Sequence, residues 1–236
     1  MRLDKFLAKC GQGTRSEAKK LIWSGQVTVD GEVIKDPTFN IDAQATQVAV
    51  QGHRLHYKEH YYLMLNKPPG VISATRDRLH PTVLGLLPLE YQHLDLFPVG
   101  RLDKDTEGLM LLSDDGVLAH RLLAPKGQVP KTYRARVRGE VNEQDIERFT
   151  QGIELKNFTT LPAQLRVLAA GEESHIEVTI YEGKFHQVKR MFHAVGKEVL
   201  YLQRVAFGGL VLDPSLPLGQ VRELTAAELD LLGEWR

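Results

Sequence analysis

Residues 99–116 read Val-Gly-Arg-Leu-Asp-Lys-Asp-Thr-Glu-Gly-Leu-Met-Leu-Leu-Ser-Asp-Asp-Gly, and this stretch says more about the fold than any other. Gly100 predicts a tight turn that presents Arg101 and Asp103 together, and Gly108 predicts a second turn that leads into an apolar run. By itself, an Arg-x-Asp pair on a turn is most often a surface ion pair worth less than about 1 kcal/mol. The chemical meaning of the stretch therefore depends on the rest of the chain.

Length and composition describe an ordinary globular protein. The chain of 236 residues has room for one domain of usual size and a small module. Hydrophobic residues make up 42% and charged residues 25%, which argues against disorder and fibre formation. The formal net charge is zero, so any case for a nucleic-acid partner must rest on local patches of charge.

The sequence predicts a cytoplasmic protein. Cys10 is the single cysteine, which excludes an intrachain disulfide and a cysteine-based metal cluster and suits a reducing cytosol. The N-terminus is too charged for a signal peptide, and no run approaches the ~20 apolar residues of a membrane span. We therefore expect no membrane association.

The first 50 residues predict two helices followed by a small sheet. Apolar side chains recur there at helical spacing and then alternate as in strands. The expected elements, in order, are a helix that buries Leu3, Phe6, Leu7 and Cys10, a helix capped by Thr14 or Ser16 and ended by Gly25, and strands at 27–29, 33–34 and 48–50 with a hairpin turn at Asp30-Gly31.

A local basic patch lies on the two predicted helices. In the first 20 residues six cations face two acids, Asp4 and Glu17. Cations on a rigid helical face can match RNA phosphates and release counterions on contact, although charges of this kind are also typical of a solvated helix face. The candidate RNA contacts are Arg2, Lys5, Arg15, Lys19 and Lys20.

Residues 51–60 are polar and weakly periodic, and we interpret them as the end of the first domain and a linker. The larger domain begins with a buried-strand pattern at 61–66, which Lys67-Pro68-Pro69-Gly70 ends. Strand runs alternate irregularly with helical stretches, which favours an α+β fold over a doubly wound sheet. The clearest of these are strands at 133–137 and 175–181 and helices at 142–151, 185–195 and 226–232.

Three segments of the larger domain carry candidate chemistry. They are Gly100–Asp103, Lys131–Tyr133 at the start of a strand, and Glu182–Met191, a turn that leads into a basic helix. Taken singly, a Lys-x-Tyr is usually an ordinary strand edge and a basic helix start is often merely solvated. Their joint presence in this order is what needs an explanation.

Together these segments resemble the motifs of the pseudouridine synthases, in the branch that carries an N-terminal S4 domain, the ribosomal small subunit pseudouridine synthase A family. Gly-Gln-Val-Thr-Val-Asp-Gly at 25–31 resembles an S4 domain, and 2–7, 65–70, 202–204 and Gly208 also stand at family-like spacing. The resemblance implies an α+β protein with a small S4-like α/β RNA-binding domain at 1–59. A larger catalytic domain at 60–236 would follow, with a mainly antiparallel mixed sheet flanked by helices, the pseudouridine synthase fold.

The resemblance also implies roles for three side chains. Asp103 would be the essential carboxylate, acting either as a nucleophile at C1′ or as a base at C2′. Lys189 would pair with Asp103 and keep it ionised. Tyr133 would stack on the flipped uracil and assist removal of the C5 proton. Because the reaction conserves atoms and exchanges no electrons, we expect no cofactor.

Four further residues are candidate substrate contacts. Arg101 would contact the phosphate of the flipped nucleotide or fill the vacated stack, and Leu202 would pack under the uracil or simply in the core. Arg190 and Arg204 would make either RNA backbone contacts or structural ion pairs. No metal site is expected, because the histidines at 53, 56 and 60 lack acidic or cysteine partners at ligand spacing.

The function implied is isomerisation of one uridine in ribosomal RNA, with 16S small-subunit RNA favoured and 23S RNA an alternative. The partner would be ribosomal RNA or an assembling ribosomal subunit, and a monomer is expected. A second hypothesis is a catalytically silent assembly factor that uses only the S4-like domain. A third is a glycoside hydrolase using Asp103 with Asp105 or Glu107, which would need two carboxylates roughly 5 to 9.5 Å apart across an open cleft.

Overall fold

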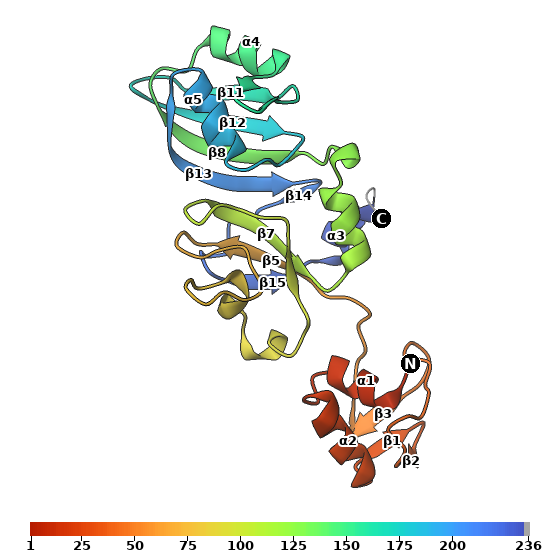
Figure 1. Ribbon diagram of the computed structural model, residues 1–236. Coiled ribbons are helices and arrows are strands. Elements are labelled where there is room, and N and C mark those ends of the chain that lie inside the picture. The colour runs from red at the N-terminus through yellow and green to blue at the C-terminus, as the bar shows by residue number, and fades with distance from the viewer. Residues whose placement is uncertain (234–236) are drawn as a thin grey trace. The chain divides into compact units, whose positions relative to one another are not determined.

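The computed structural model describes residues 1–233 and divides into two compact units (Figure 1). The first unit contains residues 1–61 and also 87–95, and the second contains 62–86 and the chain from 96 onward. Nothing in the sequence indicated that residues 87–95 belong to the first unit. There the His93 ring lies against Gly11, whose missing Cβ would stand 3.1 Å from it. Among the described residues, no helix is both long and apolar enough to span a membrane.

The first unit has the two helices and small sheet expected from its sequence. Thr14 caps the second helix in a reciprocal capping box with Glu17, and Gly25 adopts a left-handed conformation just after it. Asp30 and Gly31 both have positive φ, as a tight hairpin turn requires. The elements are α1 (Leu3–Lys9), α2 (Arg15–Trp23), β1 (Val27–Val29), β2 (Glu32–Val33), β3 (Val48–Val50) and β4 (His53–Arg54), with the strands in the order β2-β1-β3-β4.

The segment 51–60 is more structured than a linker. Its residues His53 and Arg54 form β4, which pairs with β3, and the Tyr57 ring stacks on Phe6 with the ring centroids 5.5 Å apart. Leu55 packs on the same apolar core, which includes Leu3 and Ile22. The polar composition of the segment concealed these contacts, because only two of its side chains, Leu55 and Tyr57, pack on the apolar core.

The second unit is built on a nine-stranded sheet, and this confirms the expected α+β class. Every pairing in the sheet is antiparallel except that of β7 with β13. The main order is β11-β12-β8-β13-β7-β5-β15, with β14 on β13 and β6 on β7. The strands are β5 (Tyr62–Lys67), β6 (Phe97–Val99), β7 (Glu107–Ser113), β8 (Lys131–Arg138), β11 (Gln164–Ala169), β12 (Glu173–Ile180), β13 (Glu198–Phe207), β14 (Leu210–Val211) and β15 (Val221–Glu223).

Two helices pack on one part of this sheet. Helices α4 (Glu143–Gln151) and α5 (Gln187–Ala194) lie over β8, β11, β12 and β13, where the inward side chains of β8 alternate with exposed ones (Figure 1). The remaining elements are α6 (Ala226–Leu231), the small β9 (Glu154–Leu155) and β10 (Phe158–Thr159) hairpin, and the short 3-10 turns η1 (Val83–Leu86), η2 (Leu89–Tyr91) and η3 (Pro125–Gly127).

Helix α3 (Gly116–Leu123) was not predicted from the sequence, where Asp114-Asp115 looked like a turn. The Asp115 carboxylate accepts hydrogen bonds from the backbone N–H groups of Val117 and Leu118, so it caps a helix. Turns and N-caps use the same aspartate chemistry, which explains the difference. Leu118 and Leu122 then pack into the core of the second unit.

Candidate active site

Two glycines bracket the loop that carries Asp103. Gly100 lies just before the loop as the sequence predicts, whereas Gly108 lies inside β7 and the expected second turn is at 104–105. Gly100 and Gly108 have φ values of +83° and +100°, which favour glycine. Gly108 is also forced by proximity, because β7 runs parallel to β13 and a Cβ at Gly108 would lie 2.2 Å from the carbonyl oxygen of Arg204. The loop therefore ends at a fixed point beside β13.

Lys67 holds this loop from beneath through its ammonium group, which donates hydrogen bonds to three backbone carbonyls. Its Nζ lies 2.8 Å from the oxygen of Thr106, 3.0 Å from that of Pro68 and 3.3 Å from that of Lys104. The side chain is completely buried, and this burial lowers the pKa of Lys67 to about 8 despite the nearby carboxylates of Asp105 and Asp103.

No role beyond ending a strand was predicted for Lys67. The sequence did contain an indication of this role, because a lysine that closes a buried-strand pattern must find partners for its charge.

The role of Ser73 was also not predicted. Its hydroxyl accepts the Leu102 N–H and donates to the Leu102 carbonyl, both at 2.9 Å, which fixes the residue next to Asp103.

A cleft of about 420 Å³, counting the space at its mouth, opens above the loop. It lies between the loop, the inner face of β8 and β13, and the turn that leads into α5. Five residues singled out in the sequence line this one cleft although they are scattered over a hundred positions of the chain: Arg101, Asp103, Tyr133, Lys189 and Leu202.

Lys189 forms ion pairs with two carboxylates of the loop. Its Nζ lies 3.5 Å from Asp103 Oδ2 and 2.6 Å from Asp105 Oδ1. Burial would raise the pKa of Asp105, but the hydrogen bond and charge of Lys189 outweigh it and lower that pKa. On the other side of Asp103, His186 Nε2 stands 3.7 Å from Asp103 Oδ1. The carboxylate of Asp103 therefore lies between two nitrogen-bearing side chains.

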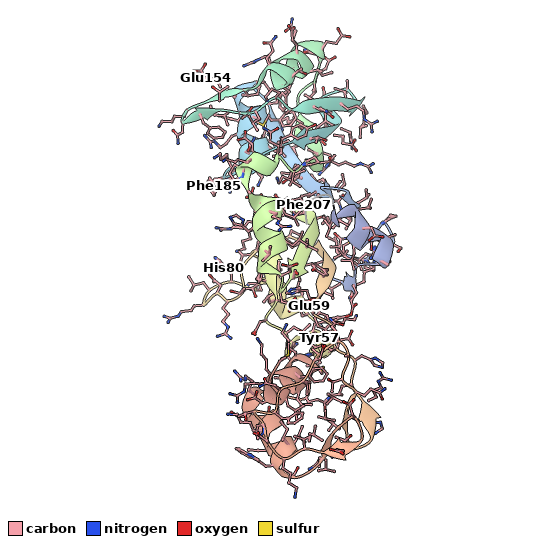
Figure 2. The ribbon with its side chains drawn as sticks, turned by 90° about the vertical axis from the view of Figure 1, so that its right-hand side faces the viewer. Tyr57, Glu59, His80, Glu154, Phe185 and Phe207 are labelled. Carbon is pink, nitrogen blue, oxygen red and sulfur yellow. The ribbon has the colours of Figure 1, made fainter. Side chains whose placement is uncertain are left out.

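Tyr133 is buried at the inner end of the cleft with Arg204 behind it. Burial raises the pKa of the Tyr133 phenol, and the charge and hydrogen bond of Arg204 only partly offset this effect. The phenol is therefore protonated at neutral pH. Arg204 is 2% exposed, donates from Nε to the Leu109 carbonyl at 2.7 Å, and lies over the Phe207 ring, labelled in Figure 2. These contacts are structural, but they are made with a backbone carbonyl and a ring in place of the ion pair that the sequence suggested.

Arg190 lies outside the cleft, at the neighbouring β9–β10 hairpin. Its guanidinium stands 5.3 Å from the centre of the Phe158 ring.

The hypothesis that this protein is a glycoside hydrolase fits the cleft poorly. Asp105 is bound by Lys189, and Glu107 accepts a hydrogen bond from Tyr201 at 2.8 Å, so both partner carboxylates are already engaged.

The candidate RNA contacts of the first unit fall into two groups. Arg2 and Arg15 both bind the carboxylate of Asp4, whose pKa burial would raise but the hydrogen bonds and charges of these arginines lower. Lys5 and Lys20 are exposed and Lys19 is half-buried. Among residues 1–233, no three His, Cys, Asp or Glu side chains converge on a possible metal position.

Comparison with known proteins shows which family this chain belongs to. The sequence profile of the RNA pseudouridylate synthase family matches residues 61–194, and that of the S4 domain matches residues 1–48. The chain belongs to the RNA pseudouridylate synthase family. It is accordingly an RNA pseudouridine synthase, an isomerase, with an S4 domain at its N-terminus.

Relatives of this pseudouridine synthase match over nearly their full length. It is 46% identical to an uncharacterized RNA pseudouridine synthase, YtzG, of Bacillus subtilis, over 99% of both chains. It is 40% identical to ribosomal small subunit pseudouridine synthase A of Escherichia coli K12, over 97% of this chain and 98% of that one. A solved pseudouridylate synthase superposes with a TM-score of 0.69 at 37% identity, covering 98% and 99% of the two chains, which confirms the expected fold.

Proposed function

We propose that this enzyme converts one uridine of small-subunit ribosomal RNA into pseudouridine, with Asp103 as the catalytic carboxylate. The observation that carries the proposal is the convergence of Asp103, Tyr133 and Lys189 on one cleft, with Lys189 Nζ 3.5 Å from the Asp103 carboxylate. The preference for the small subunit rests on relatives that are named small subunit pseudouridine synthases, at 40% to 42% identity.

The reaction breaks the N1–C1′ bond of uridine, turns the uracil and joins C5 to C1′. The proton on C5 leaves and N1 gains one, so atoms balance without an oxidant or reductant. In our proposal Asp103 either attacks C1′ or removes a proton from C2′, and Lys189 keeps its carboxylate ionised in both routes. A half-buried site strengthens this pairing relative to water.

A uridine in a folded RNA must leave its stack to reach Asp103. We propose that the flipped uracil lies between Tyr133 and Leu202, both of which line the cleft and are less than 9% exposed. Arg101, at the exposed end of the loop, then contacts the phosphate of the flipped nucleotide or fills the gap that the base leaves. Because the Tyr133 phenol is protonated, it can take the C5 proton only while it gives its own proton to an acceptor. We propose the Asp103 carboxylate, which lines the same cleft and is free again once C5 is joined to C1′, as that acceptor.

The two domains would divide the work. We propose residues 1–59 as an RNA-binding domain that holds the substrate by its phosphates and 60–236 as the catalytic domain. The substrate is then ribosomal RNA, free or within an assembling subunit. The exposed Lys5 and Lys20 are the strongest candidates for phosphate contacts, since Arg2 and Arg15 already share the Asp4 carboxylate.

Tritium release from RNA labelled at uracil C5 tests the proposal. The enzyme is given small- and large-subunit transcripts and the corresponding particles, alongside Asp103→Asn and the exposed control Glu172→Gln. We expect release from the small-subunit substrate, its abolition in Asp103→Asn and normal release with Glu172→Gln. Release only from large-subunit RNA would move the target to 23S RNA, and undiminished release by Asp103→Asn would refute the catalytic role.

A further inference from the structure

The turn between β12 and α5 places an exposed aromatic pair at the mouth of the cleft. The rings of Phe185 and His186 stack with their centroids 3.7 Å apart and their planes inclined by 18°. Phe185 is 76% exposed and projects from the surface of the second unit (Figure 2). Single exposed apolar side chains are common in proteins, so exposure alone means little. This pair differs from such side chains in two respects: it lies next to Asp103, and hydrogen bonds order the turn that carries it.

The pair extends from the Asp103 carboxylate to the solvent. His186 lines the cleft, and its Nε2 lies 3.7 Å from Asp103 Oδ1. Phe185 stacks on the His186 ring, so a two-ring stack extends from beside Asp103 to the solvent, where the Phe185 side chain is exposed. The exposed aromatic side chain therefore stands next to the place where a nucleotide bordering the target would lie.

The backbone beneath the pair is fixed. His186 has φ +49° and ψ +33°, a left-handed conformation that costs a non-glycine residue energy and is retained where the surroundings impose it. The side chain of Gln187, which is 4% exposed, accepts the Lys184 N–H at 2.9 Å and donates to Glu182 at 3.0 Å. A surface ordered before binding loses little entropy when a ligand settles on it.

The surroundings favour a nucleic acid as the occupant. Lys184 and Arg190 both lie within five positions of Phe185, and Arg190 Nη1 contacts the Phe185 carbonyl at 3.5 Å. Aromatic rings among cations are how proteins hold unpaired bases, by stacking on the base and neutralising its phosphates. Flipping one uridine also removes a stacking neighbour from the next base.

We propose that Phe185, supported by His186, is a stacking site for the base adjacent to the target uridine. The proposal rests on the function proposed above and adds a substrate contact to it. Phe185 replaces the stacking partner that the neighbouring base loses when the uridine flips. It is a binding residue, so its loss weakens the grip on RNA and leaves the chemistry at Asp103 intact.

Substitutions at Phe185 separate stacking from bulk. Phe185→Leu keeps an apolar side chain and removes the ring, Phe185→Trp keeps a ring, and Val211→Ala is a matched control at another residue that is 66% exposed. In tritium-release kinetics we expect Phe185→Leu to raise KM about tenfold with kcat unchanged, the scale of one base–aromatic stack. Phe185→Trp should restore KM, and Val211→Ala should leave it alone.

A fluorescent base makes the contact visible. In an RNA hairpin that carries the target uridine, 2-aminopurine replaces the base on its 5′ or 3′ side, and its emission falls when it stacks. We expect binding of wild-type enzyme or Phe185→Trp to quench the probe on one side, and binding of Phe185→Leu to leave it bright. Equal quenching by wild type and Phe185→Leu, or an unchanged KM, overturns the proposal.

Failure of the proposed function leaves a different signature. If the wild-type enzyme releases no tritium from any RNA, filter binding to the small-subunit transcript still compares wild type with Phe185→Leu. Weaker binding by Phe185→Leu with normal binding by Val211→Ala then supports the stacking site. Equal binding by all three proteins refutes it.

Discussion

Lys189 Nζ lies 2.6 Å from Asp105 Oδ1, closer than the 3.5 Å that separates it from Asp103 Oδ2. The lysine is therefore held mainly by a carboxylate that is itself mostly exposed, and it presents its charge to Asp103 from that anchored position. This leaves the Asp103 oxygens available to a substrate while their charge remains compensated.

Replacing Lys189 should damage catalysis more than folding. In Lys189→Met neither ion pair can form, and we expect kcat/KM to fall about a hundredfold, the scale of one positioned charged donor. Because all three groups are partly exposed, the free energy of unfolding should fall by only about 1 kcal/mol. Tritium release and urea unfolding measure the two effects, with the exposed Lys156→Met as the control. Full turnover by Lys189→Met would contradict the pairing.

Removing the Tyr133 hydroxyl should stop the reaction after binding. Tyr133→Phe keeps the ring, so RNA affinity should be unchanged while release of the C5 proton falls by about 10²-fold or more, as for loss of a general acid–base group. Filter binding and tritium release are compared for the same protein. Tyr201→Phe is a matched control, because the Tyr201 hydroxyl binds Glu107 and does not line the cleft. Normal product yield from Tyr133→Phe would rule out the proton role.

Activity should decline above a pH of about 8 as Lys67 loses its proton. Below its pKa of about 8 the ammonium group supplies three donors to three carbonyls, and above it the neutral amine supplies only two. The loop around Asp103 then loses a hydrogen bond, so kcat/KM should fall as pH rises through 8.

Lys131 provides the control for this pH profile, because burial lowers its pKa to about 8 as well. Its Nζ donates to the Val129 carbonyl at 2.7 Å, away from the Asp103 loop. Lys131→Met should therefore keep the alkaline decline of the wild type, whereas Lys67→Met should show low activity at every pH. Disappearance of the decline in Lys131→Met would show that Lys67 is not its source.

A methyl group at Gly108 should destabilise the second unit. Gly108→Ala would place a Cβ 2.2 Å from the Arg204 carbonyl at a φ of +100°, and we expect a loss of about 2–4 kcal/mol in the free energy of unfolding. Gly116→Ala is the matched control, since Gly116 starts α3 with no atom within 4 Å of a new Cβ. That change should be neutral or stabilise by up to about 1 kcal/mol. Equal stability of the two variants in urea would contradict the close approach.

The exposed lysines of the first unit should set the salt dependence of RNA binding. In a Lys5→Ala, Lys20→Ala double variant, the slope of log K against log salt should become shallower by about 1.4, or ~0.7 for each phosphate that a lysine no longer neutralises. Filter binding at several salt concentrations measures this slope. The same measurement on Arg2→Ala should show a smaller change, because Arg2 already pairs with Asp4. An unchanged slope in the double variant would exclude this face from the interface.

Local rules predicted most elements of the fold. Capping by Thr14, the turn at Asp30-Gly31 and the positive φ of Gly100 depend on neighbours in sequence, and all are as expected. Helix α3 and the association of residues 87–95 with the first unit were not foreseen. Helix α3 was missed because an aspartate such as Asp115 can begin a turn or cap a helix. Residues 87–95 join the first unit through contacts with distant segments, which periodicity within a short window does not reveal.

The candidate site likewise contains residues that the sequence predicted and supporting contacts that it did not. Motif order was enough to gather Asp103, Tyr133 and Lys189, and the structure brings all three to one cleft. The supporting contacts were missed, because the lysine that holds the loop precedes it by more than thirty residues and binds only backbone. Every residue has a backbone carbonyl, so a side chain that binds only carbonyls has no complementary residue type that could be found in the sequence.

The hydrogen bonds of Lys67 to three main-chain oxygens affect which substitutions this enzyme can accept during evolution. Since the carbonyls of residues 68, 104 and 106 would be present whatever side chains those positions carried, Lys67 places little constraint on the side chain at position 104. Lys104 is exposed next to Asp103 in the sequence and can be exchanged without releasing the loop. New RNA preferences can therefore arise there while the chemistry stays the same.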